Sequence, residues 1–199
     1  MLTQRQILVK RVFDITISLI AIILTSWLIF MAWIVASIET KSNGLFVQER
    51  IGRFGKIFKV LKIKTMKNTN KLESTVTIDG DNRITCSGKF FRKMKIDELP
   101  QLFNVLFGTM SLVGPRPDVA GFADKLEGTD RIILEVRAGI TGPASLKYRH
   151  EEMILAKEAN PERYNREVIW IDKIEINKAY VENWSLKQDI QYMIQTIIG

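Results

Sequence analysis

The stretch Ile15–Ile38, ITISLIAIILTSWLIFMAWIVASI, decides the class of the fold. Its 24 residues include no charge, no glycine and no proline, and 19 of them are apolar. As an α-helix the stretch would be about 36 Å long, which is enough to cross a hydrocarbon core of about 30 Å with some tilt. A cleaved signal peptide fits poorly, because the apolar run is too long and no small-x-small cleavage site follows it. The sequence therefore predicts a membrane-anchoring helix.

Basic residues flank this helix on both sides. They are Arg5, Lys10 and Arg11 before it and Arg50, Arg53, Lys56 and Lys59 after it. Since basic flanks prefer the cytoplasmic side, two such flanks favour a helix that enters the bilayer and returns. The bend of such a re-entrant helix would fall near Thr25-Ser26, whose hydroxyls can bond to backbone carbonyls. A plain membrane span stays an open alternative.

Outside the anchor, short strand patterns alternate with short helix patterns. This predicts an α/β fold of mixed topology, with residues 1–40 as the anchor, 41–183 as a cytoplasmic catalytic domain and 184–199 as a C-terminal amphipathic helix. Strands are expected at 45–50 and 57–64 around a turn at 52–55. Helices are expected at 87–93, 96–106, 129–135 and 172–182, and a further helix opens at Pro161. A glycine-rich turn is expected to precede a strand within 137–147.

The last segment, Trp184–Ile198, has an apolar face. Its members are Leu186, Ile190, Met193, Ile194 and Ile197. Two interpretations are open: the face packs on the core, or it lies along the membrane interface with Trp184 at headgroup level.

The composition excludes several classes of protein. The chain has 199 residues and a net charge of +7, which suits one domain of ordinary size with a basic surface. A single cysteine excludes an internal disulfide framework. With only Cys86 and His150 available, a zinc site of the usual cysteine and histidine kind is excluded. A Ser-His-Asp hydrolase would depend entirely on His150.

A strongly basic run follows the predicted hairpin turn. Seven lysines and arginines and no acidic residue lie between Arg53 and Leu72. Two interpretations have similar weight: a face lying on anionic lipid, or a pocket for phosphates. Nucleic acid has little support, because the chain is anchored and has no recognised nucleic-acid motif.

The acidic pair Asp97-Glu98 is the strongest candidate for chemistry. Asp97 is expected to cap the helix at 96–106, where the helix dipole would keep a carboxylate ionised. Five basic residues precede the pair without an intervening acid: Arg83, Lys89, Arg92, Lys93 and Lys95. An ionised pair among cations suits an anionic substrate with a divalent ion. A capping Asp beside a dipole-favoured Glu is the purely structural alternative.

A second candidate is the turn Gly114-Pro115-Arg116-Pro117. Two prolines hold Arg116 in an extended, rigid backbone. A guanidinium fixed in this way matches the oxygens of a phosphate. An ordinary structural turn with an exposed arginine is the alternative.

Taken together, these motifs resemble those of the bacterial sugar transferases, which are monotopic phosphoglycosyl transferases. The resemblance covers about residues 10–145 in the family order. Its strongest parts are Asp97–Val105, DELPQLFNV, and Met110–Pro117, MSLVGPRP. The other parts are Lys10–Asp14, Phe46–Gly52, Phe58, Lys62, Thr65-Met66, Asp81, Arg83–Thr85, Gly88–Phe90, Arg92 and Gly139–Gly142.

The resemblance implies a reaction and its participants. Such enzymes move a phosphosugar from a nucleotide-diphosphate sugar, usually a UDP-sugar, to polyprenol phosphate on the cytoplasmic face of the bacterial inner membrane. Asp97 would be the nucleophile, and Glu98 the base or a magnesium contact, so that both carboxylates are candidate ligands of Mg²⁺. The candidate substrate-binding residues are Arg92, Arg116, Lys62, Lys64, Arg83 and Gly142. The resemblance is compatible with a homo-oligomer. The alternative function is a catalytically silent membrane scaffold of the same fold.

The chain departs from the family pattern at several positions. Ser26-Trp27 stands where the membrane helix usually has Ser-Pro, so the proline at the break is missing. Lys62-Ile63-Lys64 stands in place of Lys-Phe-Arg, which replaces a fork-shaped donor by a point charge. None of the departures affects the Asp97-Glu98 pair.

Overall fold

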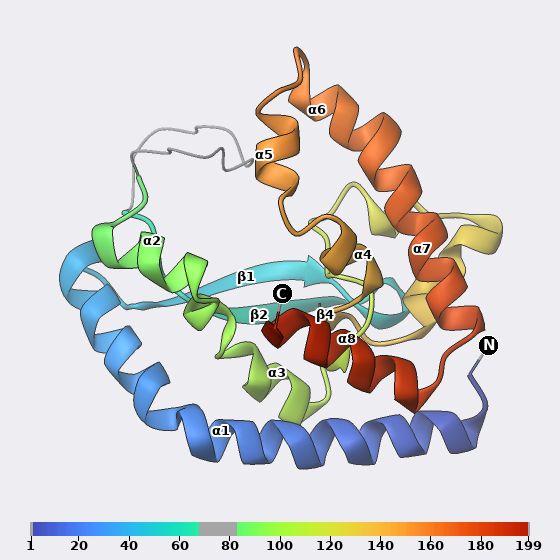
Figure 1. Ribbon diagram of the computed structural model, residues 1–199, viewed down its shortest axis with the longest axis horizontal. Coiled ribbons are helices and arrows are strands. Elements are labelled where there is room, and N and C mark those ends of the chain that lie inside the picture. The colour runs from blue at the N-terminus through green and yellow to red at the C-terminus, as the bar shows by residue number, and fades with distance from the viewer. Residues whose placement is uncertain (1, 68–82, 199) are drawn as a thin grey trace.

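The computed structural model describes residues 2–67 and 83–198. The polar loop predicted beyond Lys67, and Asp81 of the family motif, lie outside the described residues. A long N-terminal helix wraps a domain built from short helices and two small two-stranded sheets (Figure 1). The expected mixed architecture of helices and short strands with an apolar N-terminal helix is confirmed.

Helix α1 (Gln4–Thr40) is continuous over 37 residues. It begins with a capping box, in which the Thr3 hydroxyl accepts from the Gln6 backbone and the Gln6 side chain accepts from the Thr3 backbone. Figure 1 shows it running along one edge of the domain and then curving around it. Thr25 donates from Oγ1 to the Ala21 carbonyl at 2.7 Å, so the predicted hydroxyl–backbone bond is present without a break in the helix.

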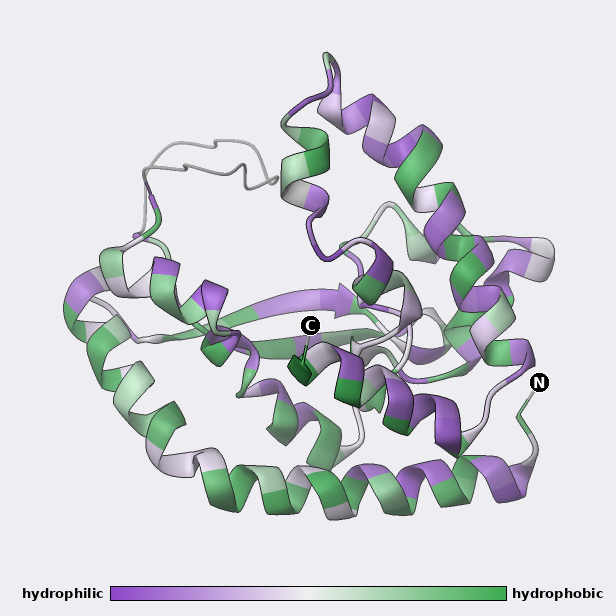
Figure 2. Ribbon diagram, in the orientation of Figure 1, coloured by the Kyte–Doolittle hydropathy of each residue, from purple (hydrophilic) through white to green (hydrophobic). Residues whose placement is uncertain are grey.

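Most of the apolar surface of α1 faces away from the protein. The helix is long and apolar enough to cross a membrane, and 11% of its most apolar window is buried inside the protein. Figure 2 shows this apolar stretch along the outer edge of the fold. A core helix of a soluble protein would be mostly buried, so this exposure fits a lipid environment.

The other side of α1 packs on the domain along its whole length. Near its start Lys10, Asp14 and Ser18 are buried, and near its end Ala32 and Ala36 are buried. The late residues join a cluster with Ile63, Phe91 and Ile96. Both ends of the helix therefore contact the same domain.

Strands β1 (Leu45–Ile51) and β2 (Ile57–Ile63) form an antiparallel hairpin, paired from Leu45↔Ile63 to Ile51↔Ile57. The turn between them is a short 3-10 segment, Arg53–Gly55, in which Phe54 and Gly55 have φ values of 61° and 75°. The strands and the turn predicted from the sequence are confirmed here.

Helix α2 (Cys86–Lys93) confirms the short helix predicted at this place. Its first turn is capped by Thr85, whose hydroxyl accepts from the Gly88 backbone at 3.0 Å. Glu39 near the end of α1 accepts from the Ser87 backbone at 3.3 Å and from the Ser87 hydroxyl. The start of α2 is thereby fixed to the end of the membrane helix.

The predicted helix at 96–106 is in fact two elements. A 3-10 turn, Ile96–Glu98, follows Lys95 in left-handed conformation (φ 56°), and α3 (Gln101–Phe107) begins after Pro100. The prediction that Asp97 caps the helix is therefore wrong, because Asp97 lies inside the 3-10 turn and Pro100 is the residue that precedes α3. The predicted apolar stripe also shifts, since Val105 is fully buried while Leu106 is not.

A second pair of strands, which is parallel, forms a separate sheet: β3 (Ser111–Val113) and β4 (Gly139–Thr141). The predicted order of turn and strand is wrong, because the strand contains Gly139 and a helix, α4 (Pro143–Lys147), follows it. A Cβ atom at Gly139 would lie 2.1 Å from the Gly114 nitrogen. The glycines are required by this close approach of two backbones.

The C-terminal part is helical. Its elements are the 3-10 segments Ala123–Lys125 and Gly128–Glu135, then α5 (Glu151–Leu155), α6 (Pro161–Tyr164), the π segment Asn165–Ile169, α7 (Trp170–Glu182) and α8 (Leu186–Ile198). Trp184 is 7% exposed and belongs to the main core. Of the two interpretations left open, Trp184 follows the one that packs on the core and does not lie at headgroup level. Ile190, Ile194 and Ile197 on the predicted face are exposed.

Candidate active site

Asp97 is held in the 3-10 turn between α2 and α3. Ile96 anchors this turn in the apolar cluster formed with Ala32 and Ala36 of α1. Asp97 itself is 9% exposed, and its Oδ1 has no hydrogen-bond partner among the described residues. A buried carboxylate oxygen without a partner carries a free-energy cost, which makes Asp97 a candidate for binding or chemistry.

Glu98, the next residue, has strong partners. Its Oε1 accepts from Arg116 Nη2 at 2.8 Å and lies 3.5 Å from the Lys62 ammonium. The two cations come from different elements, since Lys62 lies on β2 and Arg116 lies in the turn after β3. Their convergence on one carboxylate brings two of the predicted substrate-binding residues together with the acidic pair.

The two neighbouring carboxylates have opposite pKa shifts. Burial, and next the charge of Glu98, raise the pKa of Asp97 to about 6. Burial alone would also raise the pKa of Glu98, but Arg116 and Lys62 hold it well below its usual range. The expectation that the helix dipole favours ionisation of Asp97 is therefore wrong, because Asp97 does not cap α3. The pair nonetheless stays ionised at neutral pH.

Contacts with the hairpin and with Gly142 position the backbone of the Arg116 turn. Gly142 packs against it so closely that a Cβ there would lie 2.3 Å from the Gly114 carbonyl oxygen. Arg50 donates to the Pro117 carbonyl at 3.3 Å, and the Ile51 amide donates to the Asp118 carbonyl at 2.9 Å. The Arg116 side chain remains 46% exposed, so its guanidinium is accessible to a ligand.

Arg92 lies on α2 on the other side of the pair. Its Nε donates to Thr65 Oγ1 at 3.0 Å and its Nη2 contacts Met66 Sδ at 3.3 Å. Its charge also acts on Asp97 and lowers the pKa of that carboxyl against the effect of burial. Arg92 thus contributes to the field at the pair while it holds the end of the hairpin.

The remaining predicted residues have other surroundings. The Lys64 ammonium donates to Ser42 Oγ at 2.8 Å, which places it at the end of α1. The Arg83 carbonyl accepts from the Lys67 amide at 2.9 Å, beside the bridge between Met66 and Ile84. Gly142 serves the Arg116 turn through its backbone.

Comparison with known proteins assigns the sequence of this chain to a family. The model of the bacterial sugar transferase family matches residues 5–199. The chain belongs to the bacterial sugar transferases.

Three relatives illustrate the range of the family. A UDP-N-acetylgalactosamine-undecaprenyl-phosphate N-acetylgalactosaminephosphotransferase of Aeromonas hydrophila is 35% identical over 95% of this chain and 43% of its own length. The uncharacterized sugar transferase EpsL of Bacillus subtilis is 33% identical over 96% of this chain and 86% of its own. A UDP-glucose:undecaprenyl-phosphate glucose-1-phosphate transferase of Klebsiella pneumoniae is 34% identical over 94% of this chain and 39% of its own length. The chain thus spans less than half the length of two of these sugar transferases.

The acidic pair fits a magnesium ion that comes with a diphosphate. Mg²⁺ is commonly held by one or two carboxylates, with substrate phosphates and water completing its shell. The unpartnered Oδ1 of Asp97 is a free oxygen ligand of this kind, with Glu98 beside it. In residues 2–67 and 83–198 no group of three His, Cys, Asp or Glu side chains could hold a metal alone.

The structure adds positioning residues that the sequence analysis did not single out. Asn104 of this sugar transferase accepts from the Leu61 amide at 3.0 Å and donates to the Lys59 carbonyl at 2.7 Å, which fixes α3 against the edge of β2. Asp118 follows the Arg116 turn, and burial raises its pKa to about 6. A polar residue among the apolar positions of α3 was the available signal for Asn104.

Proposed function

We propose that this chain is a phosphoglycosyl transferase that moves a phosphosugar from a UDP-sugar to polyprenol phosphate. The observation that carries the proposal is the difference between two adjacent buried carboxylates. Asp97 has an oxygen without a partner, whereas Glu98 is bound by Arg116 and Lys62. The names of the relatives support the substrate classes, since two of them act on undecaprenyl phosphate with a UDP-sugar or UDP-linked sugar in their names.

The proposed transfer occurs in two displacements. The Asp97 carboxylate attacks the phosphorus that bears the sugar, the bond to the bridging diphosphate oxygen breaks, and UMP leaves with that oxygen. A phosphate oxygen of polyprenol phosphate then attacks the same phosphorus, and Asp97 departs as a carboxylate. Two displacements let a soluble donor and a lipid acceptor use one site in turn.

The other residues of the site have supporting roles in this proposal. Arg116 is half exposed and so offers guanidinium N–H groups to the donor phosphates, and Arg92 and Lys62 add positive charge. Glu98, ionised throughout, orients Arg116 and Lys62 and attracts Mg²⁺. The ion, held by Asp97 and Glu98 together with the diphosphate, would neutralise charge on the leaving group.

The packing of α1 supports a re-entrant anchor. A straight span would carry the second half of the helix away from the domain that contacts its first half. In the structure the buried residues near Lys10 and near Ala36 contact the same domain. We therefore infer that the apolar corner of α1 dips into the cytoplasmic leaflet of the bacterial inner membrane, with the catalytic domain in the cytoplasm. This location suits the first membrane step of capsule, O-antigen or exopolysaccharide assembly.

The test is release of UMP from a panel of UDP-sugars, with Mg²⁺ and polyprenol phosphate present. We expect turnover with at least one donor, and loss of more than about a hundredfold in Asp97→Asn. Asp124→Asn, which neutralises an exposed carboxylate far along the chain, is the matched control and should retain activity. Equal activity of wild type and Asp97→Asn would contradict the proposal. A folded protein with no turnover on any donor would favour the silent scaffold.

A further inference from the structure

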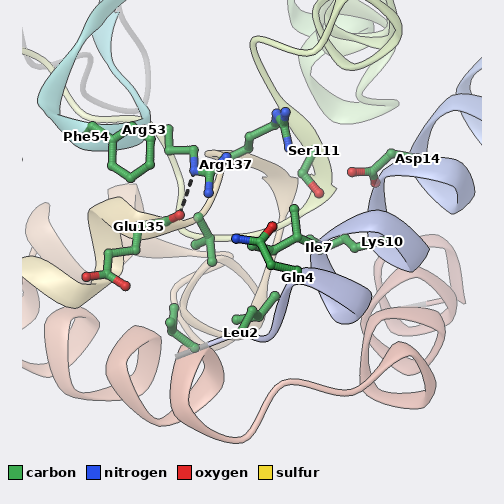
Figure 3. A pocket seen from close by; sticks show the side chains of 12 residues that line it. Leu2, Gln4, Ile7, Lys10, Asp14, Arg53, Phe54, Ser111, Glu135 and Arg137 are labelled. Atoms are coloured by element: carbon green, nitrogen blue, oxygen red, sulfur yellow. Dashed lines mark hydrogen bonds between the residues drawn. The ribbon is translucent and has the colours of Figure 1, made fainter.

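A cavity lies at the seam between the start of α1 and the domain. Its volume is about 270 Å³, and Figure 3 shows the side chains that line it. One wall is the face of α1 that carries Gln4, Ile7 and Lys10. The opposite wall is formed by the hairpin turn with Arg53, and by Arg137 and Ser111 next to the parallel strands. It is therefore built from segments distant in sequence.

The most notable property of this cavity is that two guanidinium groups face it without a carboxylate partner. Arg53 Nε donates to the Glu135 carbonyl at 2.7 Å, and Arg137 Nε donates to the Gly108 carbonyl at 2.8 Å. Each bond fixes a guanidinium through its Nε and leaves the Nη groups available. Within the described parts of the chain, neither arginine forms a salt bridge. The Glu135 carboxylate points away from both in Figure 3.

These cations repel one another in a partly buried place. Burial, and next the charge of Arg137, lower the pKa of Arg53, against a smaller opposing effect of the Glu135 charge. The same two causes lower the pKa of Arg11. Arg11 is occupied, since its Nη1 and Nη2 donate to the Val105 and Leu106 carbonyls. The Nη groups of Arg53 and Arg137 are thus the ones left to bind an anion, and an anion between them would relieve the repulsion.

A buried hydroxyl completes the polar wall. Ser111 is fully buried, and its Oγ meets no acceptor or donor at hydrogen-bonding geometry in the described structure. The Ser111 hydroxyl lies beside the Asp14 carboxylate and acts on its pKa as a hydrogen-bonding neighbour, and Asp14 also accepts from the Leu112 amide at 3.0 Å. The Lys10 ammonium is likewise engaged, with Asp189 at 2.6 Å. The two available guanidinium groups, with the Ser111 hydroxyl beside them, match a tetrahedral oxyanion.

The rest of the lining is apolar and is close to the lipid-facing side of α1. Leu2, Ile7, Phe54 and Val136 line the cavity, and Phe54 is 56% exposed. Leu8 and Val12, on the outer face of the same stretch of α1, are 64% and 56% exposed. A ligand with a phosphate and an aliphatic tail could therefore place the phosphate inside and the tail along this apolar surface.

The cavity is separate from the acidic pair. Asp97 and Glu98 precede α3, whereas Gly108, whose carbonyl holds Arg137, ends it. The seven residues of α3 span about 10 Å between these two places. We propose that this pocket, with Arg53, Arg137 and Ser111, binds the phosphate of an anionic membrane lipid at a site distinct from the donor site. The inference goes beyond the proposed transfer and does not depend on it.

The test is lipid binding to the full chain in detergent, measured by native mass spectrometry. The probes are phosphatidylglycerol, phosphatidylcholine, undecaprenyl phosphate and inorganic phosphate. We expect one phosphatidylglycerol to bind more tightly than phosphatidylcholine. Arg53→Gln and Arg137→Gln should each weaken this binding by about tenfold, and Ser111→Ala by about threefold. Arg5→Gln removes the same charge from the exposed face of α1 and should change binding less than twofold.

Each result has a definite meaning. Melting curves without lipid identify variants that fail to fold, and Ser111→Ala and Arg53→Lys then provide milder tests of the same wall. Tighter binding of undecaprenyl phosphate, with the same dependence on both arginines, would support the pocket and identify its lipid as the polyprenol phosphate. Binding of inorganic phosphate but of no lipid would overturn the proposal that the ligand is a membrane lipid. Binding of phosphatidylglycerol that is equal in wild type, Arg53→Gln and Arg137→Gln would overturn the site. None of these readouts involves turnover, so failure here would leave the proposed transfer standing.

Discussion

Two buried carboxylates of this protein, Asp97 and Asp189, have opposite surroundings. Asp189 on α8 is 1% exposed and fully satisfied: it accepts from Lys10 at 2.6 Å, from Tyr180 at 2.7 Å and from Trp184 at 3.0 Å. Asp97 is 9% exposed and has one oxygen without a partner. The Asp189 cluster joins α1 to α8 and to α7, whereas Asp97 Oδ1 bonds to no other group among the described residues.

The difference separates a structural charge from a chemical one. At Asp189 the bonds to a cation, a phenol and an indole offset the cost of burial, so this cluster attaches the membrane helix to the domain. At Asp97 the charges of Lys62, Lys95 and Arg92 offset that cost only in part, and in the proposed transfer this carboxylate is the nucleophile. Substitutions at Asp189 should therefore act mainly on stability, and substitutions at Asp97 mainly on activity.

Replacing Asp189 by Ala should have the largest effect on stability. The change removes the carboxylate bonded to the buried Lys10 ammonium and leaves only the charge of Asp14 near it, which costs about 3–5 kcal/mol. Chemical denaturation of the detergent-solubilised chain would measure the loss. The double variant Lys10→Met with Asp189→Leu removes both charges and should recover much of it. If Asp189→Ala were as stable as wild type, the cluster would not be what attaches α1.

Replacing Arg116 by Ala should act on activity instead. Loss of a charge-assisted phosphate contact costs about 1.5–3 kcal/mol, or roughly ten- to a hundredfold in kcat/KM. Arg163→Ala removes an exposed ion pair with Glu167 and is the matched control. An equal, small change in both variants would mean that Arg116 serves only Glu98. The melting temperature should fall in Arg116→Ala, because the buried Glu98 carboxylate loses its hydrogen-bonded cation, and should change little in Arg163→Ala.

The sequence predicts the local elements well, because their signals are local. The alternation of residues around the glycines at 52 and 55 is sufficient for the hairpin, and the helix expected at 87–93 is found as α2. The acidic pair and the Arg116 turn could be named as a site because motif residues and cations gather there. That Lys62 and Arg116 both contact the Glu98 carboxylate could be found only from the tertiary structure.

The wrong prediction of Asp97 as a helix cap, and the choice left open for the packing of α8, have physical causes that no local sequence pattern reveals. Lys95 adopts a left-handed backbone, which lysine rarely does, and this moves Asp97 out of a helix cap into a 3-10 turn. The bond between Lys10 and Asp189 joins residues 179 positions apart. That bond and the burial of Trp184 fix α8 in the core, so the apolar pattern at its far end did not predict the packed face.

The stability of Asp97→Asn should depend on pH and sharpen the contrast with Asp189. The pKa of Asp97 is about 6 in the folded protein and ordinarily 3.8. The stabilising effect of the protonated form is therefore full below about 3.8 and is lost as the pH rises through about 6. At pH 8 and without metal, Asn should be more stable than wild type by about 1–3 kcal/mol. Melting curves at pH 8 and pH 4.5 would show this advantage shrink; an advantage that grows at low pH would be the wrong sign.

Replacing Lys64 should have the smallest effect. Its ammonium is bound to Ser42 at the end of α1, so Lys64→Ala should change kcat/KM less than about threefold. Lys62→Ala, two residues earlier and bound to Glu98, is the comparison and should lose about tenfold. Steady-state rates with one donor would suffice. A larger loss at Lys64 than at Lys62 would reverse the assignment of the two lysines.

The most direct measurement of the central claim is a search for the covalent intermediate. Wild type is incubated with Mg²⁺ and a UDP-sugar that supports turnover, without polyprenol phosphate, and is then acid-quenched for intact-protein and peptide mass spectrometry. The account predicts a mass gain of one phosphosugar on the peptide that contains Asp97, absent in Asp97→Asn and lost when polyprenol phosphate is added. UMP release that occurs only with the acceptor present, without any mass gain on the protein, would contradict it.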